Sequence, residues 1–172
     1  MTEQELVRRC KKHDIAAQGA LYERFSGVLF GICLRYCGNK DDANDLLQDV
    51  FIRIFDRIRS FKEEGSLEGW MKITCVRQAL NFLRKENRIK KQTDPLSEKE
   101  THTSQHPFAT EDLLLSLQTL SPNERMIFNL REIEGYEYSE IVKLTSFSEG
   151  QARVCLHRAK KKLRNYWEKE LI

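Results

Sequence analysis

The residues best suited to chemistry lie close to the C-terminus, in a segment dense in positive charge. Residues 150–167 contain no acid, and their basic side chains are Arg153, Arg158, Lys160, Lys161, Lys162 and Arg164. Guanidinium and ammonium groups bind phosphate oxygens, so a basic run of this density is typical of a nucleic-acid contact. Charge alone fits a solvated basic helix about equally well. The chemistry indicated is binding, and DNA is one of two interpretations.

The apolar spacing around this segment favours DNA. A short helix is predicted first, from the apolar residues Tyr138, Ile141, Val142 and Leu144, and residues 145–148 interrupt it. A longer helix follows, with apolar residues at i, i+3, i+4 and i+7 in Ala152, Cys155, Leu156, Ala159 and Leu163. Ser148 and Gln151 have the spacing of a capping box, so the second helix should start at Ser148. Two helices joined by so short a turn are typical of a helix-turn-helix.

The second helix of such a motif lies in the major groove, and its polar side chains make two kinds of contact. Base edges are the expected partners of the side chains opposite the apolar stripe, which are Gln151, Val154, His157 and Arg158. Arg158 would bond a guanine edge bidentately, and Val154 would meet a thymine methyl group. Phosphates are the expected partners of the flanking cations Arg131, Arg153, Lys161 and Arg164.

A second basic segment lies between residues 72 and 91, where seven basic residues accompany one acid, Glu86. It belongs to a predicted helix from Leu67 to Arg88, which follows the loop SFKEEGSLEG at residues 60–69. Gln78, Asn81 and Phe82 lie on the same helix. Basic, polar and aromatic groups together suit single-stranded or locally opened DNA, where stacking contributes roughly 1–3 kcal/mol per base. A solvated face is the alternative.

Composition and length exclude several classes of protein. The chain has 172 residues, enough for one ordinary domain or two small ones, and its net charge of +3 is too small to identify a partner. The five cysteines and four histidines show neither zinc nor catalytic spacing, so we expect no metal, no cofactor and no enzyme activity. Cys33 and Cys37 are interpreted as small buried hydrophobes. A charged N-terminus without a long apolar run predicts a cytoplasmic protein without membrane insertion.

The helical repeat recurs throughout, which predicts an all-α fold of two small helical domains, the second of which contains the helix-turn-helix. The first domain is expected at residues 1–91, a flexible linker at residues 92–110 and the second domain at residues 111–172. The linker prediction depends on two prolines, many polar residues and almost no apolar spacing.

Several details of the first two long helices follow from the same patterns. Gly38 should end the second helix, and the third should open at Asp41 or Asp42. Glycines inside the second helix predict close helix packing, with a bend as the alternative: Gly19, Gly27 and Gly31. The core positions expected in the whole chain include Val28, Ile73, Leu113 and Ile133.

Two stretches resemble a known family. The string DDANDLLQDVFIRIF resembles the D-A-x-D-L-x-Q-x-x-F core signature of bacterial sigma factors. LSPNERMIFNLREIEGYEYSEIVKL together with SEGQARVCLHRAKKKLR resembles their C-terminal promoter-binding domain. With two domains and one linker, the chain is similar to the extracytoplasmic-function group (group 4) of the sigma-70 family. The resemblance extends from about Leu21 to Arg164, and the two motifs occur in the family's order.

The resemblance implies roles that spacing alone does not assign. The resemblance assigns polymerase binding to Asp45, Gln48 and Asp49, which would contact the coiled coil of the polymerase's largest subunit. The loop at residues 60–69 and the helix after it would capture a flipped base and contact the melted minus-ten DNA. The residues implied are Phe61, Lys62, Ser66, Arg77, Asn81 and Arg84. The second domain would bind the minus-thirty-five duplex, and the linker would thread the polymerase toward the RNA exit path. The partners implied are core RNA polymerase, promoter DNA and an anti-sigma factor.

The chain departs from the family pattern at several positions. Arg77 stands where the family usually has Asn, Asn81 where it has Asp, and Gln151 with Ala152 where it has Thr-Val. Ser146 replaces the usual Gly of the turn, which predicts either a positive φ costing on the order of 1 kcal/mol or a different turn. These changes leave the expected fold intact, but no relative's promoter sequence can be transferred to this chain.

The predicted function is that of a non-enzymatic initiation factor, which directs core RNA polymerase to promoters and helps to open the DNA. One alternative is a stand-alone helix-turn-helix regulator that binds duplex DNA, and another is a helical protein-interaction module. A stand-alone regulator would leave the Asp45–Gln48–Asp49 face and the basic face of residues 72–91 without a purpose. An interaction module would leave the basic recognition helix unexplained.

Overall fold

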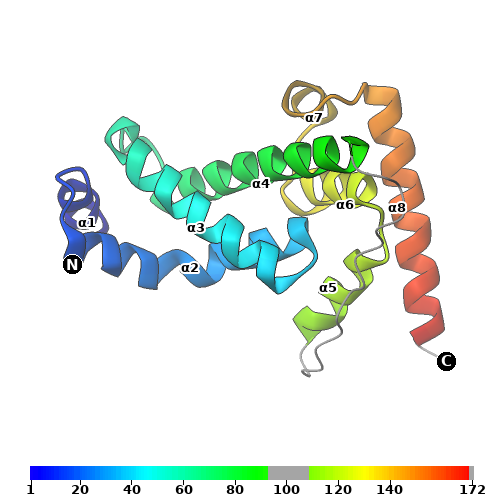
Figure 1. The fold of residues 1–172 in the computed structure, drawn as a ribbon, viewed down its shortest axis with the longest axis horizontal. Helices are drawn as coiled ribbons and strands as arrows, with labels where there is room; N and C mark the ends of the chain where they lie inside the picture. Colours follow the sequence, from blue (N-terminus) through cyan, green and yellow to red (C-terminus); the bar gives the residue numbers. More distant parts are fainter. Residues whose placement is uncertain (93–108, 171–172) are drawn as a thin grey trace. The chain divides into compact units, whose positions relative to one another are not determined.

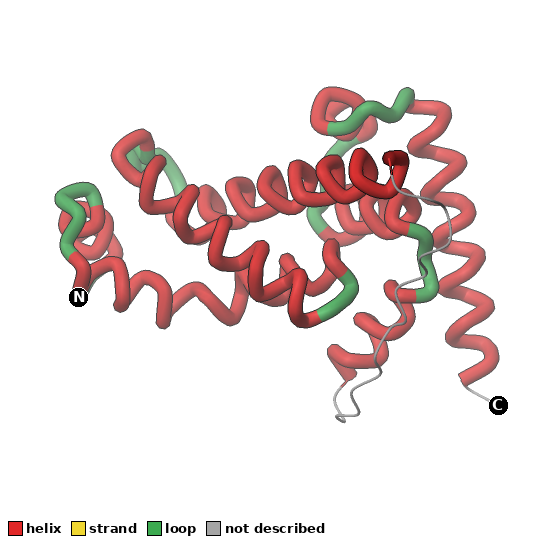
Figure 2. Tube along the Cα trace, in the orientation of Figure 1, coloured by secondary structure: helices red, strands yellow, loops and turns green. Residues whose placement is uncertain are grey.

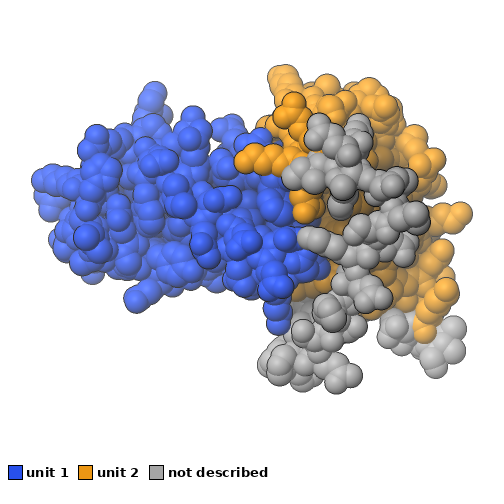
Figure 3. Space-filling view, in the orientation of Figure 1, with its two compact units in different colours: residues 1–82 blue, residues 83–172 orange. Residues whose placement is uncertain are grey.

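The computed structural model describes residues 1–92 and 109–170, and in this part of the chain every regular element is helical (Figures 1 and 2). The all-α prediction is therefore confirmed. The chain separates into two compact units, residues 1–82 and residues 83–172 (Figure 3). Most of the predicted linker, residues 92–110, lies outside the described residues, and its outermost residues belong to helices.

The first unit is built from long helices with well-defined ends. It comprises α1 (Glu3–Cys10), α2 (Ile15–Cys37), α3 (Lys40–Arg57), the 3-10 turn η1 (Ile58–Ser60) and the first part of α4 (Leu67–Gln92). Gly38 ends α2 with φ 80°, as predicted. The predicted start of α3 at Asp41 or Asp42 is wrong, because Asn39 Oδ1 accepts the Asp42 N–H at 2.9 Å and starts the helix earlier.

The core of the first unit lies between α2, α3 and α4. Its fully buried large side chains are Leu21, Leu29, Tyr36, Leu46, Ile54, Ile58, Leu67 and Met71. Cys33 lies in this core with its sulfur 3.7 Å from that of Cys75, which confirms its interpretation as a buried hydrophobe, whereas Cys37 is partly exposed. Val28 and Ile73 are 44% and 45% exposed, so their predicted burial is wrong. Both lie beside rows of buried residues spaced four apart, and the buried stripes are narrower than the apolar pattern.

The glycines of α2 do not mark close helix packing. A Cβ atom added at Gly19, Gly27 or Gly31 would meet nothing within 4 Å. The prediction of close packing is therefore wrong, because these positions lie on a part of α2 that no described side chain covers. Nothing in the first unit explains why glycine occupies all three.

The second unit contains the helix-turn-helix. It comprises α5 (Ala109–Gln118), α6 (Pro122–Phe128), the π-helical turn η2 (Asn129–Ile133), α7 (Tyr138–Leu144) and α8 (Glu149–Glu170). A capping box at Ser121 and Glu124 starts α6, and the predicted one at Ser148 and Gln151 starts α8 in the same way. One hydrophobic cluster joins α5 to α8 through Leu117, Leu120, Ala159 and Leu163.

The π-helical turn η2 explains one wrong prediction in this unit. Glu134 N–H donates to Asn129 O at 2.8 Å, which places one extra residue in the turn. The extra residue rotates Ile133 away from the core, and its side chain is 37% exposed. Leu113 on α5 is 38% exposed, so its predicted burial is wrong as well.

A charged pair ties the start of α6 to α8. Lys162 Nζ donates to Glu124 Oε2 at 2.7 Å, and the Glu124 side chain is only 8% exposed. Burial raises the pKa of the Glu124 carboxyl, but hydrogen bonds from Lys162 and Ser121 outweigh burial and hold the pKa below its ordinary value. The pair therefore stabilises the fold above the ordinary carboxyl pKa, and this contribution disappears as the pH falls through the lowered value.

We expect Lys162→Met to lower the free energy of unfolding at pH 7 by about 1–3 kcal/mol, because it leaves a buried carboxylate without its cation. Lys160→Met is the matched control, since Lys160 pairs with the more exposed Glu132 at 2.9 Å and should change stability by less than about 1 kcal/mol. Urea unfolding followed by circular dichroism measures both. Equal losses in the two variants, or a Lys162 effect that persists when Glu124 is protonated, would contradict this account.

Candidate nucleic-acid interface

The turn between α7 and α8 is closed by a threonine side chain. Thr145 Oγ1 donates to Ile141 O at 2.7 Å and accepts the Phe147 N–H at 3.3 Å, while the Thr145 backbone is extended. Among the described non-glycine residues only His13 and Glu63 have positive φ, so Ser146 does not. Of the two outcomes predicted for Ser146, the different turn is the one observed. The chain thus makes this turn without a residue in the left-handed region at position 146.

Helix α8 is divided sharply into a buried side and an exposed side. Ala152 and Ala159 are fully buried, and Leu156 and Leu163 are nearly so. The four residues predicted to contact bases are all exposed away from this stripe, and we call them the recognition face: Gln151, Val154, His157 and Arg158. Half of the Val154 surface is exposed, so its methyl groups are accessible to a base methyl group. The Gln151 side chain also accepts the Ser148 N–H at 2.9 Å, so a residue predicted to contact a base also takes part in the capping of α8.

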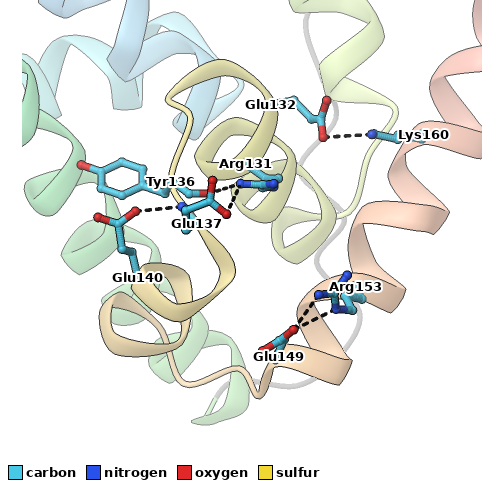
Figure 4. A network of polar contacts seen from close by, with 8 residues as sticks. All are labelled: Arg131, Glu132, Tyr136, Glu137, Glu140, Glu149, Arg153 and Lys160. Atoms are coloured by element: carbon cyan, nitrogen blue, oxygen red, sulfur yellow. Dashed lines mark hydrogen bonds and ion pairs between the residues drawn. The ribbon is translucent and has the colours of Figure 1, made fainter.

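Arg131 and Arg153 are held by neighbouring side chains in the helix-turn-helix (Figure 4). Arg131 Nη1 donates to Tyr136 O and to Glu137 Oε2, each at 3.0 Å, and the bond to Glu137 raises the pKa of Arg131. Both guanidinium groups lie over the Tyr138 ring, at 5.0 Å and 4.3 Å from its centre. These contacts fix the segment before α7 against the start of α8, a structural role that residue spacing did not reveal.

The basic side chains of α8 fall into two groups. Three pair with acids that are distant in sequence or one turn away: Arg153 with Glu149, Lys160 with Glu132 and Lys162 with Glu124. The others are exposed and, within residues 1–92 and 109–170, have no ion pair: Arg158, Lys161 and Arg164. The uncompensated positive charge of α8 is therefore concentrated in the second group.

A second set of predicted contacts lies along α4 and the loop before it, in the first unit except for Arg84, which belongs to the second. Lys62, Ser66, Arg77, Asn81 and Arg84 are all exposed. Phe61 is not, because its side chain is 6% exposed and its ring packs against Trp70 with 5.4 Å between centres. The prediction of Phe61 as a DNA contact does not fit this structure. Its ring instead supports the loop by packing against Trp70 on the buried side.

Loop 61–66 has an unusual backbone. Glu63 has φ 62° and Gly65 has φ 100°, so two nearby residues adopt the left-handed region. Ser66 Oγ accepts the Gly69 N–H at 3.2 Å and caps α4. Lys62 and Ser66 thus lie at either end of a tightly turned, exposed segment.

Helix α3 exposes a polar face next to its buried stripe. Asp45, Gln48 and Asp49 are exposed together, as expected from their i, i+3 and i+4 spacing. Ile52 lies one turn further along and is 60% exposed. Sequence reasoning missed Ile52, although an isoleucine outside the apolar stripe of a helix is a signal that could have found it. Ile52 therefore adds an exposed apolar side chain to the polar face of Asp45, Gln48 and Asp49.

The second unit is thus a helix-turn-helix with an exposed, basic second helix, an arrangement typical of a DNA-binding domain. A family model described as Sigma-70 region 2 matches residues 21–89, and one described as Sigma-70, region 4 matches residues 110–163. The chain therefore belongs to the sigma-70 family of bacterial RNA polymerase sigma factors, in its extracytoplasmic-function group.

Curated relatives support the assignment. The chain is 30% identical over 160 residues to the ECF RNA polymerase sigma factor SigE of Mycolicibacterium smegmatis, covering 87% of this chain and 61% of that protein. It is 25% identical over 180 residues to the ECF RNA polymerase sigma-E factor of Haemophilus influenzae, covering 96% of this chain and 95% of that one.

Solved structures show the same fold. The sigma factor RpoE of Bartonella quintana, in complex with the anti-sigma factor NepR, has a TM-score of 0.59 at 19% identity, covering 87% of this chain and 96% of that one. CnrH, in complex with the cytosolic domain of CnrY, has a TM-score of 0.51 at 19% identity, covering 97% of each chain.

No helix in the described part of the chain combines the length and the apolar character that crossing a membrane requires. Within residues 1–92 and 109–170, no group of three or more His, Cys, Asp or Glu side chains could hold a metal ion.

The two groups of cations on α8 should differ in the salt dependence of DNA binding. We expect Lys161→Ala to lower the slope of log K against log salt by about one, because it removes an uncompensated phosphate contact. Arg153→Ala should lower the slope by less, since Glu149 already compensates its charge at 2.6 Å. The measurement is filter binding of the complex with core polymerase to promoter DNA at several salt concentrations. Equal decreases in the two variants would show that the Glu149 pair opens on DNA.

Proposed function

We propose that this sigma factor uses three separate surfaces of the described residues to bind core polymerase and promoter DNA. The exposed face of α3 binds core polymerase, loop 61–66 with α4 holds the opened minus-ten DNA, and α8 binds the minus-thirty-five duplex. The observation that carries the proposal is the exposed Asp45–Gln48–Asp49 face, because a protein acting only on duplex DNA has no use for it. The face lies within the stretch that matches Sigma-70 region 2.

The polymerase surface combines charge with an apolar centre. Asp45 and Asp49 offer two carboxylates, Gln48 offers an amide, and Ile52 lies beside them with 60% of its surface exposed. Because the other side of α3 is fully packed in the core, this surface needs no rearrangement to bind. A rigid helix of this kind is suited to a coiled coil, which also presents a rigid helical surface.

The minus-ten surface would use backbone shape as well as charge. Lys62 and Ser66 project from a loop with two left-handed residues, and Arg77, Asn81 and Arg84 follow along α4. A loop of defined shape can form a pocket for a flipped base, whose extrusion costs a few kcal/mol that contacts in the pocket must offset. Phe61 would contribute indirectly, because its buried ring packs against Trp70 and holds the loop in place.

The minus-thirty-five surface would separate base contacts from phosphate contacts. Gln151, Val154, His157 and Arg158 form the recognition face, and Lys161 and Arg164 supply uncompensated charge for phosphates. Arg131 and Arg153 would contact phosphates only through donors that their acidic and aromatic partners leave over. Their main contribution would be to hold α7 and α8 in the geometry that docks into the groove.

Further partners and properties are part of the proposal. The solved relatives of this fold are bound to the anti-sigma factor NepR or to the cytosolic domain of CnrY, which supports an anti-sigma factor as a partner here. Sigma factors are transcription initiation factors and not enzymes, so we propose a non-catalytic, cytoplasmic protein that works without a cofactor. The stand-alone regulator is the second candidate, and no observation in the structure favours it over the first.

The polymerase surface can be tested by substitution. We expect Asp45→Ala, Gln48→Ala and Asp49→Ala in one chain to weaken binding to core polymerase by at least about tenfold, because they remove every polar contact of this face. The matched control removes the same charge elsewhere, with Glu23→Ala on α2 and Asp112→Ala on α5, both exposed. Titration with labelled core polymerase measures affinity, and circular dichroism checks helicity. Unchanged affinity of the triple variant would refute the assignment of this face.

A further inference from the structure

Lys11 joins α1 to loop 61–66. Its ammonium group donates to Phe61 O and to Glu63 Oε1, each at 2.9 Å. The side chain is only 28% exposed, whereas most lysines of a helical surface extend into solvent. One contact holds the loop backbone at its first residue, and the other holds a side chain near its middle.

Other bonds connect the same two regions at both ends of the loop. Before the loop, Arg59 Nε donates to Lys11 O at 3.2 Å, and its Nη2 lies 3.0 Å from His13 Nε2. After the loop, Leu67 N–H donates to Glu3 Oε1 at 3.4 Å. The loop is therefore fixed to α1 and to the turn that follows α1.

The backbone of the loop shows why such a fixing contact is needed. Glu63 has φ 62°, a conformation that residues with a Cβ atom rarely adopt and that surrounding contacts must maintain. Lys11 is the contact that meets Glu63 directly, through its carboxylate. In the sequence, Lys62 lies between Phe61 and Glu63, the two residues that Lys11 binds. The direction of the Lys62 side chain therefore depends on both bonds.

The position of Lys11 is itself fixed by packing. Leu6, Val7 and Cys10 of α1 are buried against the first unit, and Lys11 N–H donates to Val7 O at 2.9 Å. The ammonium group therefore extends from a fixed backbone, and only the rotamers of the Lys11 side chain have to be ordered when it binds the loop. A lysine on a mobile terminus could not define a loop shape in this way.

We propose that Lys11 is a positioning residue for minus-ten recognition, which makes α1 part of the element that discriminates among promoter sequences. Lys11 does so by holding Phe61 O and Glu63 and thereby fixing the shape of loop 61–66. The inference rests on the proposed function of this loop in binding opened DNA. Helix α1 lies before residues 21–89, the stretch that matches Sigma-70 region 2, so nothing in that match assigns it a role.

Three variants of the full chain, each assembled with core polymerase, test the proposal. Lys11→Met removes both bonds and keeps much of the apolar stem. Glu63→Gln keeps Lys11 but removes the charge that it binds. Lys12→Met is the matched control, because Lys12 is the exposed neighbour and its loss changes the net charge by the same amount. The readout is selection of transcribed templates from a library randomised across the minus-ten region, with thermal unfolding measured in parallel.

We expect Lys11→Met to reduce discrimination at the most selective minus-ten base by about fivefold or more. Glu63→Gln should shift the preference in the same direction, Lys11→Arg should restore part of it, and Lys12→Met should leave it unchanged. Equal loss on all templates with unchanged discrimination would overturn the proposal, since it would indicate either a direct phosphate contact or a purely structural role. If Lys11→Met does not fold, Glu63→Gln decides the matter alone.

One further variant separates this inference from the function on which it rests. Lys62→Ala together with Ser66→Ala changes the exposed side chains of the loop and leaves the Lys11 contacts in place. If this loop variant alters the minus-ten preference and Lys11→Met does not, the positioning role fails while the loop's function stands. If neither alters it, the proposed function of the loop fails as well.

Discussion

The DNA-binding unit depends on the burial of one side of α8. Ala152 and Ala159 are completely buried, and their small side chains allow α6 and α7 to pack close to the α8 backbone. Because the buried residues recur at helical spacing, the recognition face must lie on the opposite side. A larger residue at Ala152 or Ala159 would push α8 away from its neighbours and rotate the face that meets DNA.

Charged contacts add to the packing that positions α8 against α6 and α7. Glu124 and Lys162 connect α6 to α8 beside the buried stripe, and the Tyr138 ring lies under both Arg131 and Arg153. These pairs use half of the cations that make the C-terminal segment so basic: Arg153, Lys160 and Lys162. A basic run in a sequence therefore overstates the charge available to DNA, because acids on other helices compensate part of it.

Some helix ends and the division of α8 into a buried and an exposed side could be predicted from the sequence, because they depend on local patterns. Gly38 and Ser148 act through hydrogen bonds to residues three or four positions away or through their own backbone angles. Apolar spacing placed the buried stripe of α8 for the same reason.

Features that depend on distant residues could not be predicted in this way. Val28 and Ile73 have helical spacing but no neighbour to cover them, and the extra residue of the η2 turn rotates Ile133 outward. Phe61 lies in a loop, and the local sequence pattern does not show that its ring packs against Trp70. The bonds from Lys11 to loop 61–66 join residues fifty or more positions apart. The α3 face was assigned by resemblance, and the roles of individual site residues stay predictions.

The central claim is that one chain brings promoter selection to core polymerase. Run-off transcription from a library of randomised templates, with purified core polymerase and the full chain, tests it most directly. The account predicts that transcripts appear only when the chain is present, and that the transcribed templates share two sequence elements at a fixed separation. Duplex DNA binding by the chain alone, without chain-dependent transcripts from any template, would contradict it and would indicate a stand-alone regulator.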